Sequence, residues 1–221
     1  MQLTHATLSR RRGDAGFTIV EVLVASTISM AALGAFLSFN RFQLYALRNQ
    51  ANQIDIQTTA RSIVDLFARE VRRAGMNPNC AIPAFSGIAA AKSTSVRVQS
   101  DLNGDGALTA LNEDLTYRYN FENNAVERVD HNGTTDTLVS GLNYNGSIIR
   151  YFDGAGAELI PFFWTGLTAA QRSAVRRIRI QLALVGTAVD PVSEQRLTAQ
   201  AATDVDVRNR YFVNATACPG S

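Results

Sequence analysis

The chain has 221 residues, of which 46% are hydrophobic and 18% are charged. This length suits one ordinary domain plus an accessory element, and this composition excludes wholesale disorder. The formal net charge is +2, and the first sixteen residues carry the same charge through three arginines and Asp14, so the rest of the chain is near neutral. A near-neutral remainder offers no basic patch for phosphates, and no nucleic-acid partner is expected.

A long apolar stretch follows the basic start of the chain. Residues 17–39 are almost all apolar, and Glu21 is their single charge. A helix that rises about 1.5 Å per residue spans roughly 34 Å over this stretch, more than the ~30 Å hydrocarbon core of a bilayer. Arg10, Arg11 and Arg12 precede it, and positive charge is retained on the cytoplasmic side. The sequence therefore predicts a transmembrane helix whose N-terminus stays in the cytoplasm.

An ordinary secretory signal peptide is the alternative for this stretch. Small residues such as Ala32, Gly34 and Ala35 would supply a cleavage site. However, the apolar run is longer than a usual signal core and continues without a turn into an amphipathic segment. An ordinary signal also does not need Glu21, and an ionisable side chain inside an apolar helix indicates a function.

The junction between leader and apolar run reads Gly16-Phe17-Thr18-Ile19-Val20-Glu21. Behind a basic leader and ahead of a long apolar run, this sequence resembles the processing site of type IV prepilins and type II secretion pseudopilins. The resemblance implies that a prepilin peptidase cuts after Gly16, removes the leader 1–16 and N-methylates Phe17. It also implies that other pilins and minor pilins are the partners of the mature chain.

In the mature chain Glu21 would be the acidic fifth residue. Cleavage leaves a positively charged amine on Phe17, and both the amine and the carboxylate are costly in an apolar filament core unless they are paired. In the family this pair is thought to form between neighbouring subunits, which would set their axial register during assembly. The alternative is a carboxylate that snorkels or stays protonated in lipid.

The helix is expected to continue beyond the apolar run, through residues 40–75. Apolar residues recur there at intervals of three or four, which places them on one face of a helix. They are Ile56, Ala60, Ile63, Phe67 and Val71. Gly75 is the expected C-cap and Pro78 prevents continuation, so one helix is predicted from about Phe17 to Ala74.

The remaining residues, 76–221, show short alternating runs that are typical of strands. The predicted strands are 95–99, 115–120, 125–129, 148–152, 177–185 and 197–207, with a hairpin between the second and the third. Thr168 is expected to cap a short helix that runs to Ala174. The fold class is therefore α+β, in which a long N-terminal helix packs on a C-terminal antiparallel sheet, as in pilins.

Two cysteines, Cys80 and Cys218, lie near the ends of this β-rich part. They are too few for a zinc site without a histidine pair, and His5 and His131 are isolated. One disulfide is the simplest interpretation, and it would indicate an oxidising compartment. Two unpaired buried thiols are the alternative.

Three later segments resemble minor pilins of the PilW type and the related J-type pseudopilins. They are residues 101–106 ahead of 114–119, residues 175–182 and residues 206–210. These segments favour a minor over a major pilin. With the processing site, the resemblance spans most of the chain.

The segment 101–106 also begins like a calcium loop of the EF-hand type. Asp101, Asn103 and Asp105 place oxygen ligands at alternate positions, and a glycine follows at the sixth. The twelfth position, where a bidentate acid is expected, is Asn112, and Glu113 comes one residue late. Calcium is the hypothesis, and a turn rich in residues that tolerate a left-handed backbone is the alternative.

A minor pilin that takes part in type IV pilus assembly is therefore the first functional hypothesis. Such a protein crosses the bacterial inner membrane once, holds its C-terminal domain in the periplasm and later reaches the pilus at the cell surface. A type II secretion pseudopilin is the alternative within the family. A membrane-tethered adhesive protein stabilised by calcium is the alternative of another class. No nucleophile–base set is recognisable, and no enzymatic activity is predicted.

Overall fold

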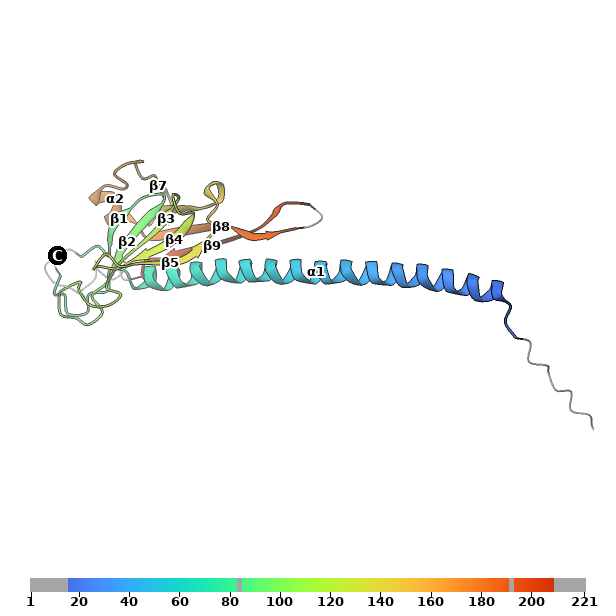
Figure 1. Ribbon diagram of the computed structural model, residues 1–221. Coiled ribbons are helices and arrows are strands. Elements are labelled where there is room, and N and C mark those ends of the chain that lie inside the picture. The colour runs from blue at the N-terminus through green and yellow to red at the C-terminus, as the bar shows by residue number, and fades with distance from the viewer. Residues whose placement is uncertain (1–15, 83–84, 191–192, 209–221) are drawn as a thin grey trace, which may run out of the picture. The chain divides into compact units, whose positions relative to one another are not determined.

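The computed structural model describes residues 16–82, 85–190 and 193–208 (Figure 1). One long helix, α1 (Ile19–Arg73), is followed by antiparallel strands in two sheets. The predicted α+β arrangement is therefore confirmed. The chain forms two compact units that meet between Leu47 and Arg48, and each unit is described by itself.

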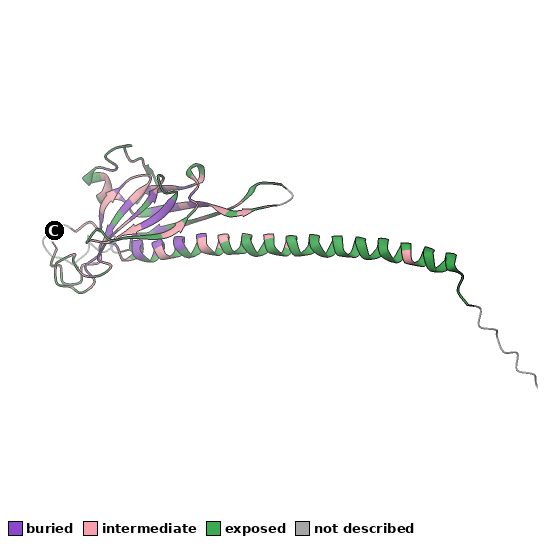
Figure 2. Cartoon of the chain, viewed as in Figure 1, coloured by how far each residue is buried: buried purple, intermediate pink, exposed green. Residues whose placement is uncertain are grey.

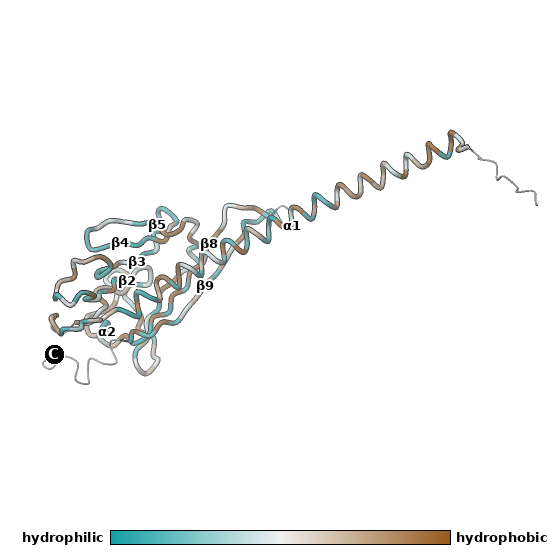
Figure 3. Tube along the Cα trace, turned by 90° about the horizontal axis from the view of Figure 1, so that it is seen from below, coloured by the Kyte–Doolittle hydropathy of each residue, from teal (hydrophilic) through white to brown (hydrophobic). Residues whose placement is uncertain are grey.

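In the first unit the described backbone is helical from Ile19 onward. Its large apolar side chains are exposed on all sides of the helix, as the side chain of Phe36 illustrates with 61% exposure. Brown, the colour of hydrophobic residues, predominates along this stretch of the tube in Figure 3. By length and composition the helix is able to cross a membrane.

In the second unit, strands β1 (Ile88–Ala91), β2 (Ser95–Gln99), β3 (Asp114–Asn120), β4 (Ala125–Val129) and β5 (Thr135–Ser140) form one sheet. Each strand pairs antiparallel with its neighbour in the chain, so the sheet is a meander.

A second sheet has the strand order β7-β6-β8-β9. Its strands are β6 (Ile148–Phe152), β7 (Glu158–Leu159), β8 (Arg177–Val189) and β9 (Arg196–Asp206). A 3-10 turn, η1 (Tyr144–Gly146), precedes β6, and α2 (Ala169–Ala174) lies between β7 and β8. The sequence predicted one sheet, and the structure has two. The alternation of apolar and polar residues along a strand indicates which face of the strand is buried, but it does not indicate which other strands pair with it.

The core of the second unit lies between the two sheets and the last turns of α1. The predicted stripe is buried from Ala60 to Val71, and Ile56 packs against its margin (Figure 2). The ring of Phe67 meets that of Tyr117 edge-on at a centroid distance of 4.8 Å. A cavity of about 10 Å³ lies beside this contact, which is room for one water molecule and not for a ligand.

The end of α1 is fixed by the glycine that the sequence predicts as its cap. Gly75 has φ +81°, and its N–H donates to the carbonyl of Gln99 at 2.9 Å. The φ angle favours glycine because it has no Cβ. This bond ties the end of the helix to the end of β2.

Candidate functional site

The processing sequence lies at the start of α1. Gly16, Phe17 and Thr18 precede the helix, and Phe17 is 85% exposed. A Cβ built on Gly16 would meet nothing within 4 Å. Crowding within the described residues therefore does not require glycine at this position.

Thr18 and Glu21 form a capping box, which the sequence analysis missed although the signal Thr-x-x-Glu was present. The hydroxyl of Thr18 accepts the N–H of Glu21 at 3.2 Å. In return, Oε2 of Glu21 accepts the N–H of Thr18 at 3.1 Å and its hydroxyl at 3.2 Å. The Glu21 carboxylate therefore satisfies the backbone donor of Thr18, the residue directly after Phe17.

Three other hydroxyl groups of the apolar run find hydrogen-bond acceptors within the helix. The hydroxyls of Ser26, Thr27 and Ser38 donate to backbone carbonyls of the preceding turn at 2.9, 2.8 and 2.9 Å. Lipid offers no hydrogen bonds, so polar groups in a spanning helix must find partners internally. These serines and this threonine are therefore compatible with a lipid or apolar protein environment.

The proposed calcium ligands lie in a loop between β2 and β3. Asp101 is buried, and its two carboxylate oxygens accept the N–H groups of Gly104 and Gly106 at 2.6 and 3.1 Å. Asn103 and Asp105 are exposed, and the amide of Asn103 donates to the carboxylate of Asp105 at 2.8 Å.

Glu113 closes this loop from inside, a role that the sequence did not reveal. Its fully buried carboxylate accepts the N–H groups of Leu102, Asn103 and Ala110 at 2.9, 3.3 and 2.9 Å. Across the described residues, no three His, Cys, Asp or Glu side chains lie together so as to hold a metal ion. The oxygens of Asp101 and Glu113 organise the backbone, and calcium binding stays a prediction.

The cysteine pairing also stays a prediction. Cys80 lies in the turn after α1 with φ +53°, and Cys218 is outside the described residues. The leader residues Asp14 and Arg10 to Arg12 lie outside the described residues too.

Ion pairs across neighbouring strands cover the outer faces of both sheets. Arg97 donates to both oxygens of Asp114 at 2.7 and 2.5 Å, and Arg179 binds Asp204 with two bonds of 2.7 Å. Burial alone would raise the pKa of Asp114, but the hydrogen bonds from Arg97 and Gln99 outweigh it and lower that pKa. The charges on these faces are thus balanced locally.

Two family comparisons match the chain. The family described as prepilin peptidase-dependent protein B matches residues 49–215. The prokaryotic N-terminal methylation motif matches residues 11–37, which include Gly16, Phe17 and Glu21. No curated protein and no solved structure matches the chain. The matches indicate a pilin-type structural protein rather than an enzyme, and they support membrane anchoring through α1.

Proposed function

The chain belongs to the prepilin peptidase-dependent protein B family, and we propose that it is a minor pilin that takes part in type IV pilus assembly in a priming or tip complex. The prepilin peptidase cuts after Gly16 and methylates the new terminus at Phe17. The mature chain then leaves the membrane and joins the filament through its N-terminal helix.

The observation that carries this proposal is the exposed apolar half of α1 directly behind a processing motif. Burying an exposed apolar side chain contributes about 1.5–3 kcal/mol, and this half displays a long series of them. A protein that exposes so much apolar surface needs lipid or other helices around it. In a pilin, lipid surrounds the helix first, and other helices surround it after assembly into the filament.

Glu21 has two roles in this proposal. In the precursor it caps its own helix through Thr18. After cleavage the ammonium group of Phe17 competes for the same carboxylate, and pairing with a neighbouring subunit sets the axial register. Both charges lie in apolar surroundings, where a pair costs far less than two isolated ions.

The orientation follows from the leader. Arg10, Arg11 and Arg12 stay on the cytoplasmic side. The β-rich unit then lies in the periplasm, where Cys80 and Cys218 find the oxidising conditions that a disulfide needs.

The direct test is the N-terminus of the mature protein extracted from membranes. Intact mass and N-terminal sequencing are expected to show a chain that starts at N-methylated Phe17. A chain that starts at Met1, or one cut near Ala35, would reject the proposal.

A pair of Glu21 variants separates the two roles of the carboxylate. Glu21→Gln keeps an acceptor for the capping box but removes the charge, and Glu21→Ala removes both. Both variants are expected to insert in the membrane and to be cut, and both should enter filaments poorly. Normal incorporation of Glu21→Gln would show that the ion pair does not set the register.

A pseudopilin of a type II secretion system is the second candidate, because the same processing site and the same helix serve both machines. Deletion of the gene separates them. Loss of surface pili with normal protein secretion supports the minor pilin, and the opposite result supports the pseudopilin.

A further inference from the structure

A loop joins β7 to α2 (Figure 1). It carries four large apolar side chains that are exposed. Its exposed side chains, called the aromatic tip below, are Ile160, Phe162, Phe163 and Trp164. Each is between 67% and 76% exposed. Phe163 and Trp164 meet edge-on with ring centroids 4.8 Å apart. Neighbouring exposed apolar residues of this size mark an interaction site.

The aromatic tip is held in place by its backbone. The N–H of Gly166 donates to the carbonyl of Phe162 at 2.8 Å, and the N–H of Leu167 donates to the carbonyl of Ala91 in β1 at 2.8 Å. Gly166 has φ +77°, and a Cβ there would lie 2.3 Å from the Ala91 carbonyl oxygen. Leu167 is buried in the core. The sheet thus presents the aromatic side chains in a fixed position, which lowers the entropic cost of binding.

The base of the aromatic tip is positively charged. The stem of Lys92 lies beside Gly166, and the guanidinium of Arg172 donates to the carbonyl of Leu167 at 2.9 Å. The sequence has no acidic residue between Glu70 and Asp101, nor between Glu158 and Asp190. Residues 91–92 and 160–172, which form the aromatic tip and its base, lie within these two segments, and Glu158 precedes the tip by two residues. A complementary partner therefore carries carboxylates around an apolar surface.

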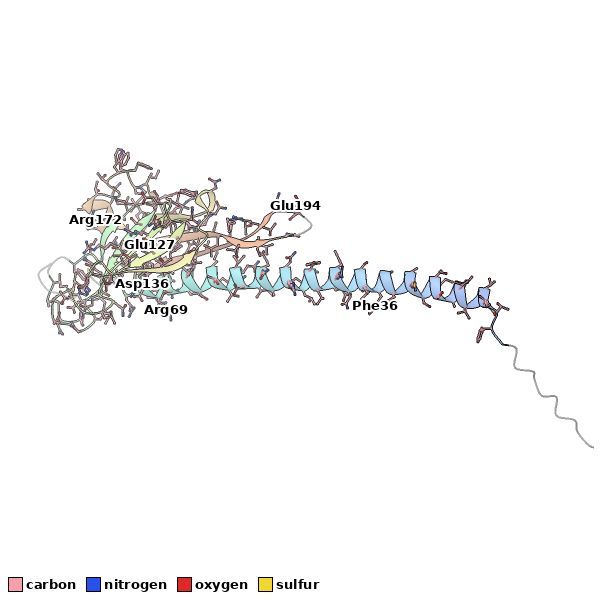
Figure 4. All side chains as sticks on the ribbon, viewed as in Figure 1. Phe36, Arg69, Glu127, Asp136, Arg172 and Glu194 are labelled. Atoms are coloured by element: carbon pink, nitrogen blue, oxygen red, sulfur yellow. The ribbon has the colours of Figure 1, made fainter. Side chains whose placement is uncertain are left out.

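Within residues 48–221, the aromatic tip lies far from the point where the helix enters. Figure 4 places Arg172, which contacts the base of the tip, and Glu194 at opposite ends of the unit. Glu194 belongs to the β8–β9 turn, in which Asp190 bonds Asn49 near the start of the unit. The anchoring helix enters at the Glu194 end. Within this unit the aromatic tip is thus at the end remote from Arg48, where the unit begins.

We propose that the aromatic tip docks into an apolar pocket rimmed by carboxylates on a partner protein. Phe163 and Trp164 fill the pocket, since tryptophan and other aromatic side chains dominate protein interfaces. Lys92 and Arg172 meet the acidic rim. This contact is separate from the helix packing of the proposed function and adds a partner at the other end of the β-rich unit.

The test is photocrosslinking of the full chain in its own cells. A benzophenone amino acid replaces Trp164 in one strain and Leu111 in a control strain, because Leu111 is 72% exposed in a different loop. Position 164 is expected to give one discrete protein adduct, at least about tenfold stronger than position 111. Mass spectrometry of the crosslinked peptide should find Asp or Glu beside an apolar surface.

Exchanging the charges on the two proteins distinguishes specific docking from a crosslink that forms by chance proximity. Lys92→Glu is expected to weaken the adduct severalfold, and a matching change of one partner carboxylate to lysine should restore it. The melting temperature should stay unchanged, since Lys92 donates from its backbone to Ser95 and that bond survives. An adduct with lipid, an adduct with a second copy of this chain, the absence of a protein adduct, or failure of the charge exchange would each overturn the proposal. Filament incorporation measured in the same cells reports on the helix packing independently.

Discussion

The two halves of α1 are one continuous helix with opposite surroundings. Residues 19–39 are almost all apolar and exposed, whereas residues 48–73 carry one apolar stripe that is buried against the sheets. Phe36 is 61% exposed in the first half, and Phe67 is 3% exposed in the second. A stripe shows that a helix finds its partner in its own chain, and an apolar surface on every side shows that its partner lies outside.

The largest effect is expected when phenylalanine is changed to alanine, once in each half of the helix. Phe67→Ala is expected to lower the free energy of unfolding of the β-rich unit by about 3–5 kcal/mol, because it leaves a cavity beside Tyr117. Phe36→Ala removes the same atoms from an exposed position and is expected to change it by less than about 0.5 kcal/mol. Chemical unfolding of the full chain in detergent measures both values.

The control for this pair is filament assembly. Phe36→Ala is expected to reduce incorporation into filaments despite normal folding, because the proposed assembly packs its ring on a neighbouring helix. Equal losses of unfolding free energy for the two variants would show that the first half also packs within its own chain, and the comparison would fail.

Much of the fold was predictable because alternation and helical spacing are local signals. The strands 95–99 and 148–152 match the structure at both ends, and the hairpin of β3 and β4 pairs as expected. Strands β1 and β5 were missed because an alanine run and a polar run show no apolar alternation. The extension of β8 to Val189 was missed as well, because alternation of apolar residues stops at Gly186.

The candidate site was predictable only where the motif alone defines it. Gly16, Phe17 and Glu21 follow from spacing, and the family comparisons match the same region. The role of Glu113 was not predictable from the motif, because a calcium loop of the EF-hand type has its last acid one residue earlier, at position 112. In the structure Asn112 takes φ +67°, and the residue after it turns its carboxylate into the loop. A single left-handed residue thus changes which side chain closes the loop.

A smaller effect, on local helix stability, is expected at the two capping boxes. They are the same motif in two different environments. Thr18 caps α1 and Thr168 caps α2, each with its partner three residues later. A change of either threonine to valine costs about 1 kcal/mol of local helix stability. The loss at Thr18 is expected to be larger in a lipid bilayer, because water cannot replace the lost acceptor there. Hydrogen exchange of the first helical turn, measured in lipid nanodiscs, gives both values.

Detergent solution supplies the control for the capping pair. If water reaches the start of α1 in micelles, the two losses should become alike. A larger loss at Thr168 than at Thr18 in nanodiscs would show that the start of α1 is hydrated, contrary to a membrane or filament-core location.

The smallest expected effect is that of pH on the stability of the β-rich unit. This unit carries most of the titratable groups, because residues 17–47 contain only Glu21 and Arg41 as charged residues. The pKa of Asp114 is lowered on folding, so its pair with Arg97 stabilises the fold above the ordinary carboxyl pKa. That stability is lost as the pH falls through the lowered value. Asp114→Asn should therefore reduce stability at pH 7 by less than about 1 kcal/mol, because the arginine is partly solvated.

The difference between Asp114→Asn and the parent chain should shrink as the pH falls below the ordinary carboxyl pKa of about 4 and through the lowered pKa of the folded protein. Urea unfolding at pH 7, 5 and 3 measures it, and Arg97→Gln is the matched background. In that background Asp114 no longer accepts hydrogen bonds from Arg97, so folding lowers its pKa less. Asp114→Asn should therefore reduce the free energy of unfolding at pH 7 by a smaller amount. A constant difference at every pH, in both backgrounds, would show that Asp114 stabilises the strand ends by its shape and hydrogen bonds rather than by its charge.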